Sequence, residues 1–572
     1  KKIYKMGNKE TKICQNCKKD FIIEPDDFAF YEKMKVPPPT FCPECRKQRR
    51  LSWRNDFNLY NNSCKLCGKS IVTLFSPESK MTVYCNKCWW SDKWDPRDYG
   101  ADYDSSKTFF GQMQGLIQKV PVLATVNDDG IGSINSEYTH DFAFSKNCYM
   151  VFVAWKIENV LYSYYTIAGK DMVDCTNIMD FCQFIYEGLQ LEQCSRVKWS
   201  QNCISCLDSA FLYDCRDCSN CFLCAGLRHK KYYFKNKQHT KEEYQKIIDS
   251  YQIDTWSGSE RAKKELEEFI MTIPRKFSNN KQCYNCTGDF LINGKNSKHC
   301  FNVQKPENDK WIENADSPKD SYDLSIGGEL SECYEGITCD QSNKNLFGIF
   351  SWKSRDIQYT HHCHSSHDLF GCVGLRNAEY CILNKQYSKE EYEKLRSQII
   401  SDMNSSPYVD ARGMQYKFGE FYPTELSYFA YNETMAQEQF PLEREEALKN
   451  NWKWQDSLQR TTGKETIQPE DIPESIEGVK DDIVKEVLRC IDCSRNYKIV
   501  EAELALYRKM KVPIPRRCFC CRLSARLKKR NSFKLWHRKC MKPGCINEFE
   551  TSYSPDRPEI VYCEQCYNSE VA

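Results

Sequence analysis

The feature that most constrains this 572-residue chain is a set of eight cysteines that occurs twice, once near each end. The two copies are displaced by 476 residues from Cys14 to Cys490 and from Cys64 to Cys540. The displacement is 478 residues from Cys67 onward, because residues 541–544 widen one cysteine pair. Equal spacing over such a length predicts a duplicated module.

Most of these cysteines come in C-x-x-C pairs, which are typical of zinc knuckles. We expect two four-cysteine sites at each end and therefore four zinc ions. Sequential pairing of the knuckles would give tandem zinc ribbons, whereas interleaved pairing would give a cross-brace, and the spacing allows both. Cys520 is read as a spare thiol. The predicted metal ligands are Cys14, Cys17, Cys42, Cys45, Cys64, Cys67, Cys85, Cys88, Cys490, Cys493, Cys518, Cys521, Cys540, Cys545, Cys563 and Cys566.

The chain contains 35 cysteines, which a secreted protein would use for disulfides. Its first residues are basic and include no apolar stretch that would indicate a secretory signal. No run of about 18 apolar residues indicates a membrane span. We therefore expect a reducing, cytoplasmic location, thiolates that bind metal, and no membrane partner.

Arginines follow the second knuckle of each module at intervals of four residues, which places them on one face of a helix. Basic side chains with aromatic residues between them suit phosphate contact and base stacking. If acids of the central body covered these faces, the arginines would be structural clamps instead. The predicted nucleic-acid contacts are Arg46, Arg49, Arg50, Arg54, Arg516, Arg517, Arg522, Arg526, Lys528, Lys529, Arg530 and Arg538.

Charge is unevenly distributed along the chain. Residues 1–94 and 485–572 each hold 19 basic and 10 acidic side chains, a net charge of +9 at each end. The formal charge of the whole chain is only +2, so the middle carries −16. Such asymmetry favours ends that bind a polyanion or ends that pack against the acidic middle.

The central region contains a second repeat, displaced by 148 residues. "CAGLRHKKYYFKNKQ" begins at Cys224 and "CVGLRNAEYCILNKQ" begins at Cys372. Capping boxes follow, Thr240 with Glu243 and Ser388 with Glu391, and each predicts a short helix. Upstream, short alternating segments recur about every 10–20 residues, which predicts two parallel β-solenoids. An irregular β-sandwich is the alternative.

Six cysteines of the first repeat lie close together in residues 203–224, four of them in a C-x-x-C-x-x-C-x-x-C run that is also seen in iron–sulfur proteins. In the second copy Ser351 and Ser354 replace two of them, and such exchange favours small buried positions over ligands. We therefore do not expect an iron–sulfur cluster. The six are Cys203, Cys206, Cys215, Cys218, Cys221 and Cys224.

The second copy has a histidine-rich segment around Cys363, at His361, His362, His364 and His367. Alternate residues of a strand share one face, so some of these side chains would meet and could bind a metal. We favour partly exposed histidines.

We predict a mostly β, multidomain chain with duplicated tandem zinc-ribbon modules that flank a duplicated parallel β-solenoid with short connecting helices. The predicted segments are an N-terminal double zinc-ribbon module (1–94), a helical connector (95–125), the first solenoid repeat with its capping helix (126–250), a second helical connector (251–282), the second solenoid repeat with its capping helix (283–404), an aromatic strap and acidic linker (405–476) and a C-terminal double zinc-ribbon module (477–572).

Three stretches carry a resemblance: "FYEKMKVPPPTFCPECRKQRR", "NCTGDF" with "GLRNAEYCILNKQYSKEEY", and "FAYNETMAQEQFPLEREEALKNNWKW". They resemble the uncharacterised cysteine-rich zinc-ribbon proteins of ultrasmall candidate-phylum bacteria. The resemblance covers nearly the whole chain. It implies an architecture and carries no known activity.

These features favour a non-enzymatic, zinc-dependent scaffold that binds nucleic acid, as RNA or a ribonucleoprotein, through the basic faces. One alternative is a structural or assembly protein that binds partner proteins through its solenoid and zinc modules. Another is a carbohydrate-active β-helix enzyme, since such folds host clustered carboxylates. We predict no catalytic residue, because the available acids show no evident pair: Asp128, Asp129, Asp174, Asp180, Asp208 and Asp214.

Overall fold

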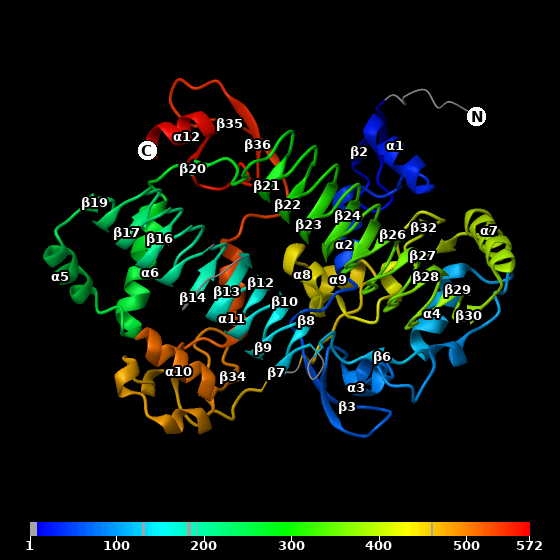
Figure 1. The fold of residues 1–572 in the computed structure, drawn as a ribbon, viewed down its shortest axis with the longest axis horizontal. Coiled ribbons are helices and arrows are strands. Elements are labelled where there is room, and N and C mark those ends of the chain that lie inside the picture. The colour runs from blue at the N-terminus through cyan, green and yellow to red at the C-terminus, as the bar shows by residue number, and fades with distance from the viewer. Residues whose placement is uncertain (1–8, 129–131, 180–184, 192, 459–460, 572) are drawn as a thin grey trace. The chain divides into compact units, whose positions relative to one another are not determined.

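The computed structural model describes residues 9–128, 132–179, 185–191, 193–458 and 461–571. Over these residues the chain is mostly β-sheet, with 12 α-helices (Figure 1). It forms two compact units, and neither is continuous in sequence. Unit 1 comprises Lys1–Thr125 and Asn279–Leu458, and unit 2 comprises Val126–Ser278 and Gln459–Ala572. Each unit therefore combines one cysteine-rich end with the central repeat that is more distant in sequence.

Unit 1 contains a sheet of ten short strands, which we call the unit 1 stack (Figure 1). Each strand pairs in parallel with the next at a step of 12 residues, as Ile357 pairs with Leu369 and Leu369 with Cys381, and the last turns back antiparallel. Parallel pairing differs from the sandwich alternative, whose strands are antiparallel. The strands are β21 (Gly288–Ile292), β22 (Cys300–Gln304), β23 (Lys310–Asp316), β24 (Tyr322–Gly328), β25 (Tyr334–Ile337), β26 (Asn343–Leu346), β27 (Arg355–Gln358), β28 (His367–Phe370), β29 (Glu379–Ile382) and β30 (Lys385–Gln386).

Unit 2 contains an equivalent set of strands, the unit 2 stack, which also pairs mainly in parallel at 12-residue steps. The strands are β7 (Ile134–Glu137), β8 (His140–Ala143), β9 (Lys146–Tyr149), β10 (Phe152–Trp155), β11 (Glu158–Leu161), β12 (Tyr164–Ile167), β13 (Lys170–Met179), β14 (Tyr186–Leu189), β15 (Ser195–Lys198), β16 (Leu207–Tyr213), β17 (Ser219–Ala225), β18 (Lys231–Phe234) and β19 (Lys237–Gln238).

A left-handed backbone conformation recurs at every third residue of both stacks. Asp320, Asp323 and Ile326, for example, have φ values of 48°, 57° and 65°. Ser321 and Leu324, each one residue after such a bend, are buried. The side chains that face the interior therefore recur every three residues, whereas a flat strand would alternate every two.

Asparagine side chains form ladders along the stacks. In unit 2 the Nδ2 atoms of Asn135 and Asn147 donate to the Oδ1 atoms of Asn147 and Asn159, each at 3.0 Å. Asn159 donates to Asp171 Oδ1 at 2.7 Å. Asn and Asp tolerate left-handed backbone better than most residues, so these positions serve both the bend and the ladder.

The predicted capping-box helices are present, and each follows the last strands of its stack. Helix α5 (Lys241–Tyr251) begins after Thr240, and α7 (Lys389–Ser405) begins after Ser388. The connectors form α4 (Phe109–Lys119) in unit 1 and α6 (Trp256–Ile270) in unit 2. Among the described residues, no helix is both long and apolar enough to cross a bilayer.

The predicted strap packs within unit 1, where Phe421 and Tyr422 are fully buried. It carries β31 (Tyr408–Val409), β32 (Gln415–Tyr416), α8 (Met435–Gln439) and α9 (Arg444–Lys449). The segment predicted as an acidic loop or linker belongs to unit 2, where Ile472 and Ile476 are buried. These isoleucines anchor a segment whose composition indicates solvent exposure.

Candidate metal centres and buried arginines

The cysteines at both ends gather into four quartets. Within each quartet the four Sγ atoms lie within 4.8 Å of one another. The grouping pairs the knuckles sequentially, so the cross-brace alternative is wrong. None of the described cysteines forms a disulfide. The quartets are Cys14, Cys17, Cys42 and Cys45; Cys64, Cys67, Cys85 and Cys88; Cys490, Cys493, Cys518 and Cys521; and Cys540, Cys545, Cys563 and Cys566.

The spacing of the sulfur atoms fits a tetrahedral metal ion. A tetrahedron with metal–sulfur bonds of about 2.3 Å has edges of about 3.8 Å. The Sγ atoms of Cys17 and Cys42 lie 3.7 Å apart, and those of Cys67 and Cys85 lie 3.9 Å apart. Four thiolates at these distances could therefore hold a soft divalent ion without rearrangement.

All four quartets are built in the same way, from a β-hairpin turn and a helix N-terminus. The hairpins are β1 (Glu10–Ile13) with β2 (Asp20–Ile23), β3 (Tyr60–Ser63) with β4 (Ser70–Thr73), β33 (Leu488–Arg489) with β34 (Asn496–Tyr497), and β35 (Trp536–Lys539) with β36 (Glu548–Thr551). The helices are α2 (Pro43–Leu51), α3 (Asn86–Trp89), α11 (Phe519–Lys529) and α12 (Glu564–Glu570).

The third cysteine of every quartet is the N-cap of its helix, where the helix dipole favours a thiolate. Its backbone N–H also donates to the Sγ of the first cysteine. This distance is 3.3 Å from Cys42 to Cys14 and 3.2 Å from Cys85 to Cys64. Such contacts orient and stabilise metal-bound sulfur.

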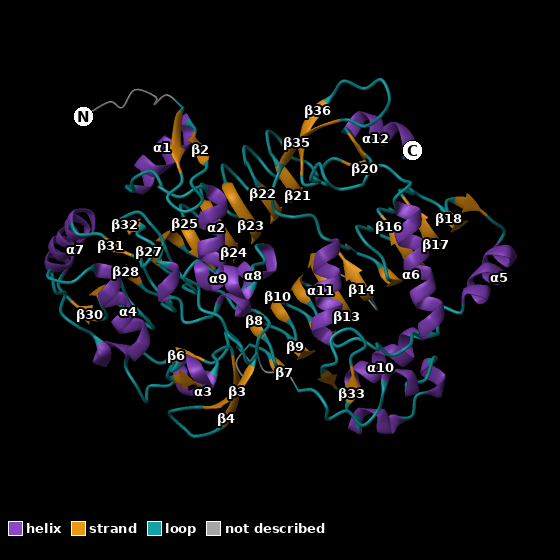
Figure 2. Ribbon diagram, turned by 180° about the vertical axis from the view of Figure 1, so that it is seen from behind, coloured by secondary structure: helices purple, strands orange, loops and turns teal. Residues whose placement is uncertain are grey.

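In unit 1 the arginines of α2 point into the stack and bind two of its acids. Arg46 donates from Nε and Nη2 to Asp323 Oδ2 at 3.0 and 2.8 Å. Arg50 Nη1 reaches Asp323 Oδ1 at 3.1 Å. Arg49 pairs with Glu335 at 2.9 Å. Asp323 and Glu335 are the second residues of β24 and β25, neighbouring strands that lie behind α2 in Figure 2. The stack therefore presents two acids, one step apart, to the helix.

Unit 2 repeats this construction with α11. Arg522 Nε pairs with Asp174 Oδ2 at 2.9 Å, and Arg526 Nη1 pairs with Asp174 Oδ1 at 2.8 Å. Arg526 also donates to the backbone oxygen of Tyr162 at 3.0 Å. In both units, therefore, two arginines four residues apart on a metal-module helix share one fully buried aspartate of the stack. We call these two arrangements the arginine clamps.

These contacts contradict part of the predicted nucleic-acid surface. Phosphate cannot reach guanidinium groups that are desolvated and held by carboxylates within the fold. The alternative prediction, that these arginines are structural clamps, describes them instead. The prediction is wrong for the six arginines that are at most 4% exposed, which are Arg46, Arg49, Arg50, Arg54, Arg522 and Arg526.

The other predicted contacts are closer to the surface of the C-terminal module. Arg516 pairs with Glu474 at 2.6 Å, and half-buried Arg517 pairs with Glu260 at 2.8 Å. Lys529 is exposed and pairs with Glu267 at 3.3 Å. Lys528 is exposed, and Arg530 and Arg538 are partly exposed. These contacts leave Lys528, Arg530 and Arg538 accessible to a ligand.

The six central cysteines line the interior of the unit 2 stack, at most 1% exposed. Their thiols donate to backbone oxygens two residues earlier, at 3.2 Å from Cys203 to Gln201 and from Cys218 to Arg216. Burial raises the pKa of the Cys203 thiol. The prediction of small buried positions is confirmed, and the C-x-x-C spacing follows from the three-residue period of the stack.

The prediction of partly exposed histidines is wrong for three of the four. His361, His362 and His364 are buried in unit 1, and His361 Nε2 lies 2.8 Å from the hydroxyl of Tyr428. Burial lowers the pKa of His362 to about 3. His364 packs against Trp352 with ring centroids 3.6 Å apart. These side chains therefore act as neutral, aromatic members of the core.

Three of the six acids considered for catalysis are bound to arginines, and a fourth, Asp128, accepts from the backbone N–H of Phe144. Asp174 belongs to a clamp, Asp208 receives Arg196 Nη2 at 2.8 Å, and Asp214 receives Arg228 Nη2 at 3.2 Å. Each of these three carboxylates thus has a structural partner. Two further candidates lie outside the described residues, Asp129 and Asp180.

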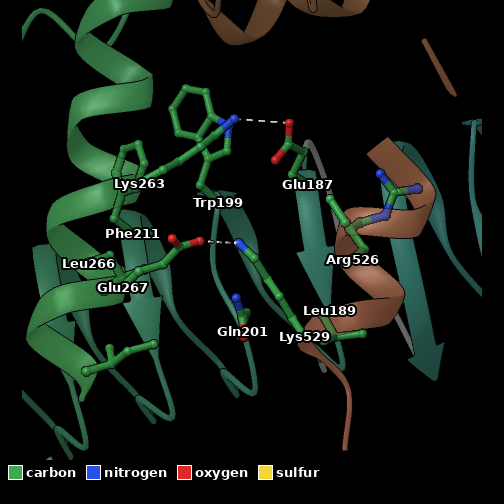
Figure 3. A pocket seen from close by; sticks show the side chains of 12 residues that line it. Glu187, Leu189, Trp199, Gln201, Phe211, Lys263, Leu266, Glu267, Arg526 and Lys529 are labelled. Atoms are coloured by element: carbon green, nitrogen blue, oxygen red, sulfur yellow. Dashed lines mark hydrogen bonds and ion pairs between the residues drawn. The ribbon is translucent and has the colours of Figure 1, made fainter. Parts of the chain in front are cut away.

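A cavity in unit 2 lies between α6, α11 and the stack (Figure 3). Lys263 pairs with Glu187 at 3.1 Å and Lys529 with Glu267 at 3.3 Å across it, and Trp199 lines it. Its volume is about 30 Å³, room for about two water molecules. Pockets for small molecules usually measure about 300–1,000 Å³, so this cavity is too small for a substrate.

One buried acid near the unit 2 clamp should make stability depend on pH. Burial raises the pKa of Glu503 to about 7, although Arg522 and the hydroxyls of Tyr507 and Tyr162 oppose the shift. The folded state therefore holds a proton that the unfolded state loses near pH 4.5, and stability falls as the pH rises from about 4.5 to 7. We expect Glu503→Gln to be more stable than wild type at pH 8, by up to about 3 kcal/mol.

The measurement is urea unfolding of metal-loaded protein between pH 6 and 8.5. The difference between Glu503→Gln and wild type should shrink toward pH 6. Glu501→Gln changes an exposed acid on the same helix, α10 (Glu501–Met510), and is the matched control, which should show no such trend. A difference independent of pH would mean that Glu503 is ionised throughout.

Comparisons with known proteins add little to this geometry. No protein-family model and no curated protein matches the chain. One similar solved structure is a protein of Desulfovibrio desulfuricans G20 that is provisionally described as an acetyltransferase. The match has 9% identity and a TM-score of 0.10, and it covers 48% of this chain and 87% of the other. At that TM-score the match carries no argument about fold or function.

Proposed function

We propose that the protein is a non-enzymatic, zinc-dependent scaffold that binds nucleic acid. Its body would be two β-solenoids, which the 12-residue parallel steps and the 148-residue repeat support. Its ends would be duplicated tandem zinc ribbons, which the four similarly built quartets support. In this proposal the arginine clamps fix the ribbons to the solenoids, so nucleic acid meets side chains that the clamps leave at the surface.

The observation that carries the proposal is a difference between equivalent strands of the two modules. Strand β35 reads WHRK, whereas β3 of the N-terminal module reads YNNS. His537 and Lys539 are exposed, and Trp536 and Arg538 are half-buried. Cations beside an aromatic ring suit phosphate contact and base stacking. Glu548 pairs with His537 and Lys539 at 2.9 and 3.1 Å, but exposed pairs of this kind are weak and can be displaced.

The sequence of β3 provides a matched replacement for β35. The variant W536Y/H537N/R538N/K539S, the β35 graft, gives β35 the sequence of β3. It removes two permanent cations and introduces residues that form a strand in the equivalent hairpin of the N-terminal module. We expect weaker binding of RNA and DNA, with the slope of log affinity against log salt reduced by about 1.4–1.8. Fluorescence anisotropy over a salt series measures both. Wild-type binding that is insensitive to salt, or an unaffected graft, would refute the proposal.

A second candidate, assembly with partner proteins, is favoured by the widened knuckle of the same module. Ile546 is 91% exposed and Met541 45% exposed, and exposed apolar side chains in one short segment favour a protein contact. Ile546→Ser separates the two functions. Under the nucleic-acid proposal it leaves oligonucleotide binding unchanged, whereas under assembly it removes partners that survive nuclease treatment of a lysate.

A further inference from the structure

The unit 2 stack has an open groove that the proposed function does not use. The groove measures about 470 Å³, which is within the range of ligand sites. It is lined by Ile134, Phe144, Lys146, Lys156, Glu158 and Lys170, together with small residues such as Ala168. All these residues belong to the same unit as the C-terminal module.

Two columns of side chains form the groove, because equivalent positions recur every 12 residues. Ile134, Lys146, Glu158 and Lys170 follow one another along the first column through parallel pairing of β7, β9, β11 and β13. Phe144, Lys156 and Ala168 occupy the second column. Successive members of a column are about 4.8 Å apart, so Phe144 and Lys156 are direct neighbours. The next member, Ala168, has a small side chain, and the space beside it forms the hollow of the groove.

The groove has more positive charge than its own acids neutralise. Lys170 pairs with Glu158 at 3.2 Å, whereas exposed Lys146 and Lys156 make no ion pair with any described residue. The nearby carboxylate of Asp128 is turned to the backbone and accepts from the N–H of Phe144 at 3.1 Å. Two lysines are therefore left for an anion.

The groove also presents an aromatic ring. Phe144 is 61% exposed, and Ile134 beside the groove is 64% exposed. Water solvates such side chains poorly, so a flat apolar partner would gain from covering them. A nucleobase is flat and carries phosphate beside it, whereas an acidic peptide would satisfy the lysines and leave the ring uncovered. Bases of a duplex are already stacked and cannot reach the ring.

We propose that this groove is a second nucleic-acid site, specific for single strands, in which a base stacks on Phe144 and the flanking phosphates contact Lys146 and Lys156. The inference rests on the proposed function, because it names the form of nucleic acid that the scaffold holds. It adds a site in the solenoid body that is independent of β35.

The test compares three labelled probes by fluorescence anisotropy: a 12-nucleotide oligo-dT, a 12-base-pair duplex and a poly-glutamate peptide of equal charge. The variant is F144N/K146Q/K156Q, since Asn is well tolerated at the left-handed backbone of residue 144. We expect oligo-dT affinity to fall at least about tenfold, because loss of one stacked base alone costs about 5–150-fold. Duplex affinity should fall less than about threefold.

Lys305→Gln is the matched control, an exposed lysine at a left-handed position of the unit 1 stack, and it should leave oligo-dT affinity unchanged. Circular dichroism and metal content establish that each variant is folded.

The outcomes separate the two proposals. If wild type binds oligo-dT, and the β35 graft weakens that binding while the groove variant does not, the groove inference is wrong and the proposed function stands. Equal loss of duplex binding, or loss of poly-glutamate binding instead, also overturns it. Wild type that binds no nucleic acid refutes both.

Discussion

If the quartets hold zinc as proposed, its removal is expected to unfold both terminal modules. A structural zinc site contributes about 10–16 kcal/mol to folding, and the hairpins and helices that carry these ligands are short. Helices α2 and α11 begin at the third ligands, Cys42 and Cys518, so metal loss should also release the arginine clamps. Treatment with a zinc chelator should lower helix content and make both ends sensitive to protease.

Single substitutions give the same prediction site by site. Cys42→Ser should reduce the zinc content from four ions to three and expose the N-terminal module to proteolysis. Cys520→Ser, an exposed thiol outside the quartets, is the control and should retain four ions. Unchanged protease resistance after complete removal of metal would show that the modules fold without it.

Loss of a clamp aspartate is expected to have the second largest effect. Asp323→Ala leaves Arg46 and Arg50 buried without their shared carboxylate, and breaking a buried ion pair in this way costs about 3–5 kcal/mol. Asp174→Ala should destabilise unit 2 to a similar extent, because it strands Arg522 and Arg526. Urea unfolding of metal-loaded protein, followed by separate probes in the two units, measures each loss.

The controls separate charge burial from general damage. Asp320→Ala removes a more exposed acid of the same stack, which pairs with Lys33 at 3.2 Å, and should cost less than about 1 kcal/mol. Replacing the whole cluster, as R46M/R50M/D323L, should recover much of the stability lost in Asp323→Ala. An Asp323→Ala variant as stable as wild type would mean that the arginines are not desolvated, and the surface role first predicted for them would return.

The metal quartets could be predicted from sequence because their geometry is local. Two residues between paired cysteines fix a turn, and the equal spacing of Cys14–Cys64 and Cys490–Cys540 identifies a repeated module. The choice between sequential and interleaved pairing depends on how the hairpins pack, and spacing does not record that. The structure decides it through the Sγ atoms, because that of Cys42 lies beside that of Cys17 and that of Cys85 beside that of Cys67.

The direction of the arginines could not be predicted in the same way. A four-residue interval shows that Arg46 and Arg50 share a helix face, but not whether that face meets solvent or protein. Arginine is rarely buried unless it is paired, and the partner, Asp323, lies 277 residues along the chain. The acidic middle of the chain was the available signal, but it was equally consistent with arginines that bind a polyanion and with arginines that pack against the middle.

The stacks were only partly predictable because their period is unusual. A period of two, appropriate to flat strands, places His362 and His364 on one face, whereas the bends of this chain give a period of three. The signal was present in the cysteines from Cys215 to Cys224, which recur every third residue and all point inward. The left-handed positions themselves could not be identified from residue type, because Ile326 and Phe144 adopt the same conformation as the asparagines.

The central claim is that sixteen thiolates bind four metal ions and thereby place arginines against buried acids. Native mass spectrometry of the protein as purified, combined with thiol alkylation, tests it most directly. We predict a mass increase corresponding to four zinc ions, with the sixteen quartet cysteines protected from alkylation until a chelator is added. A metal-free mass, or cystine bridges within the quartets, would contradict the account.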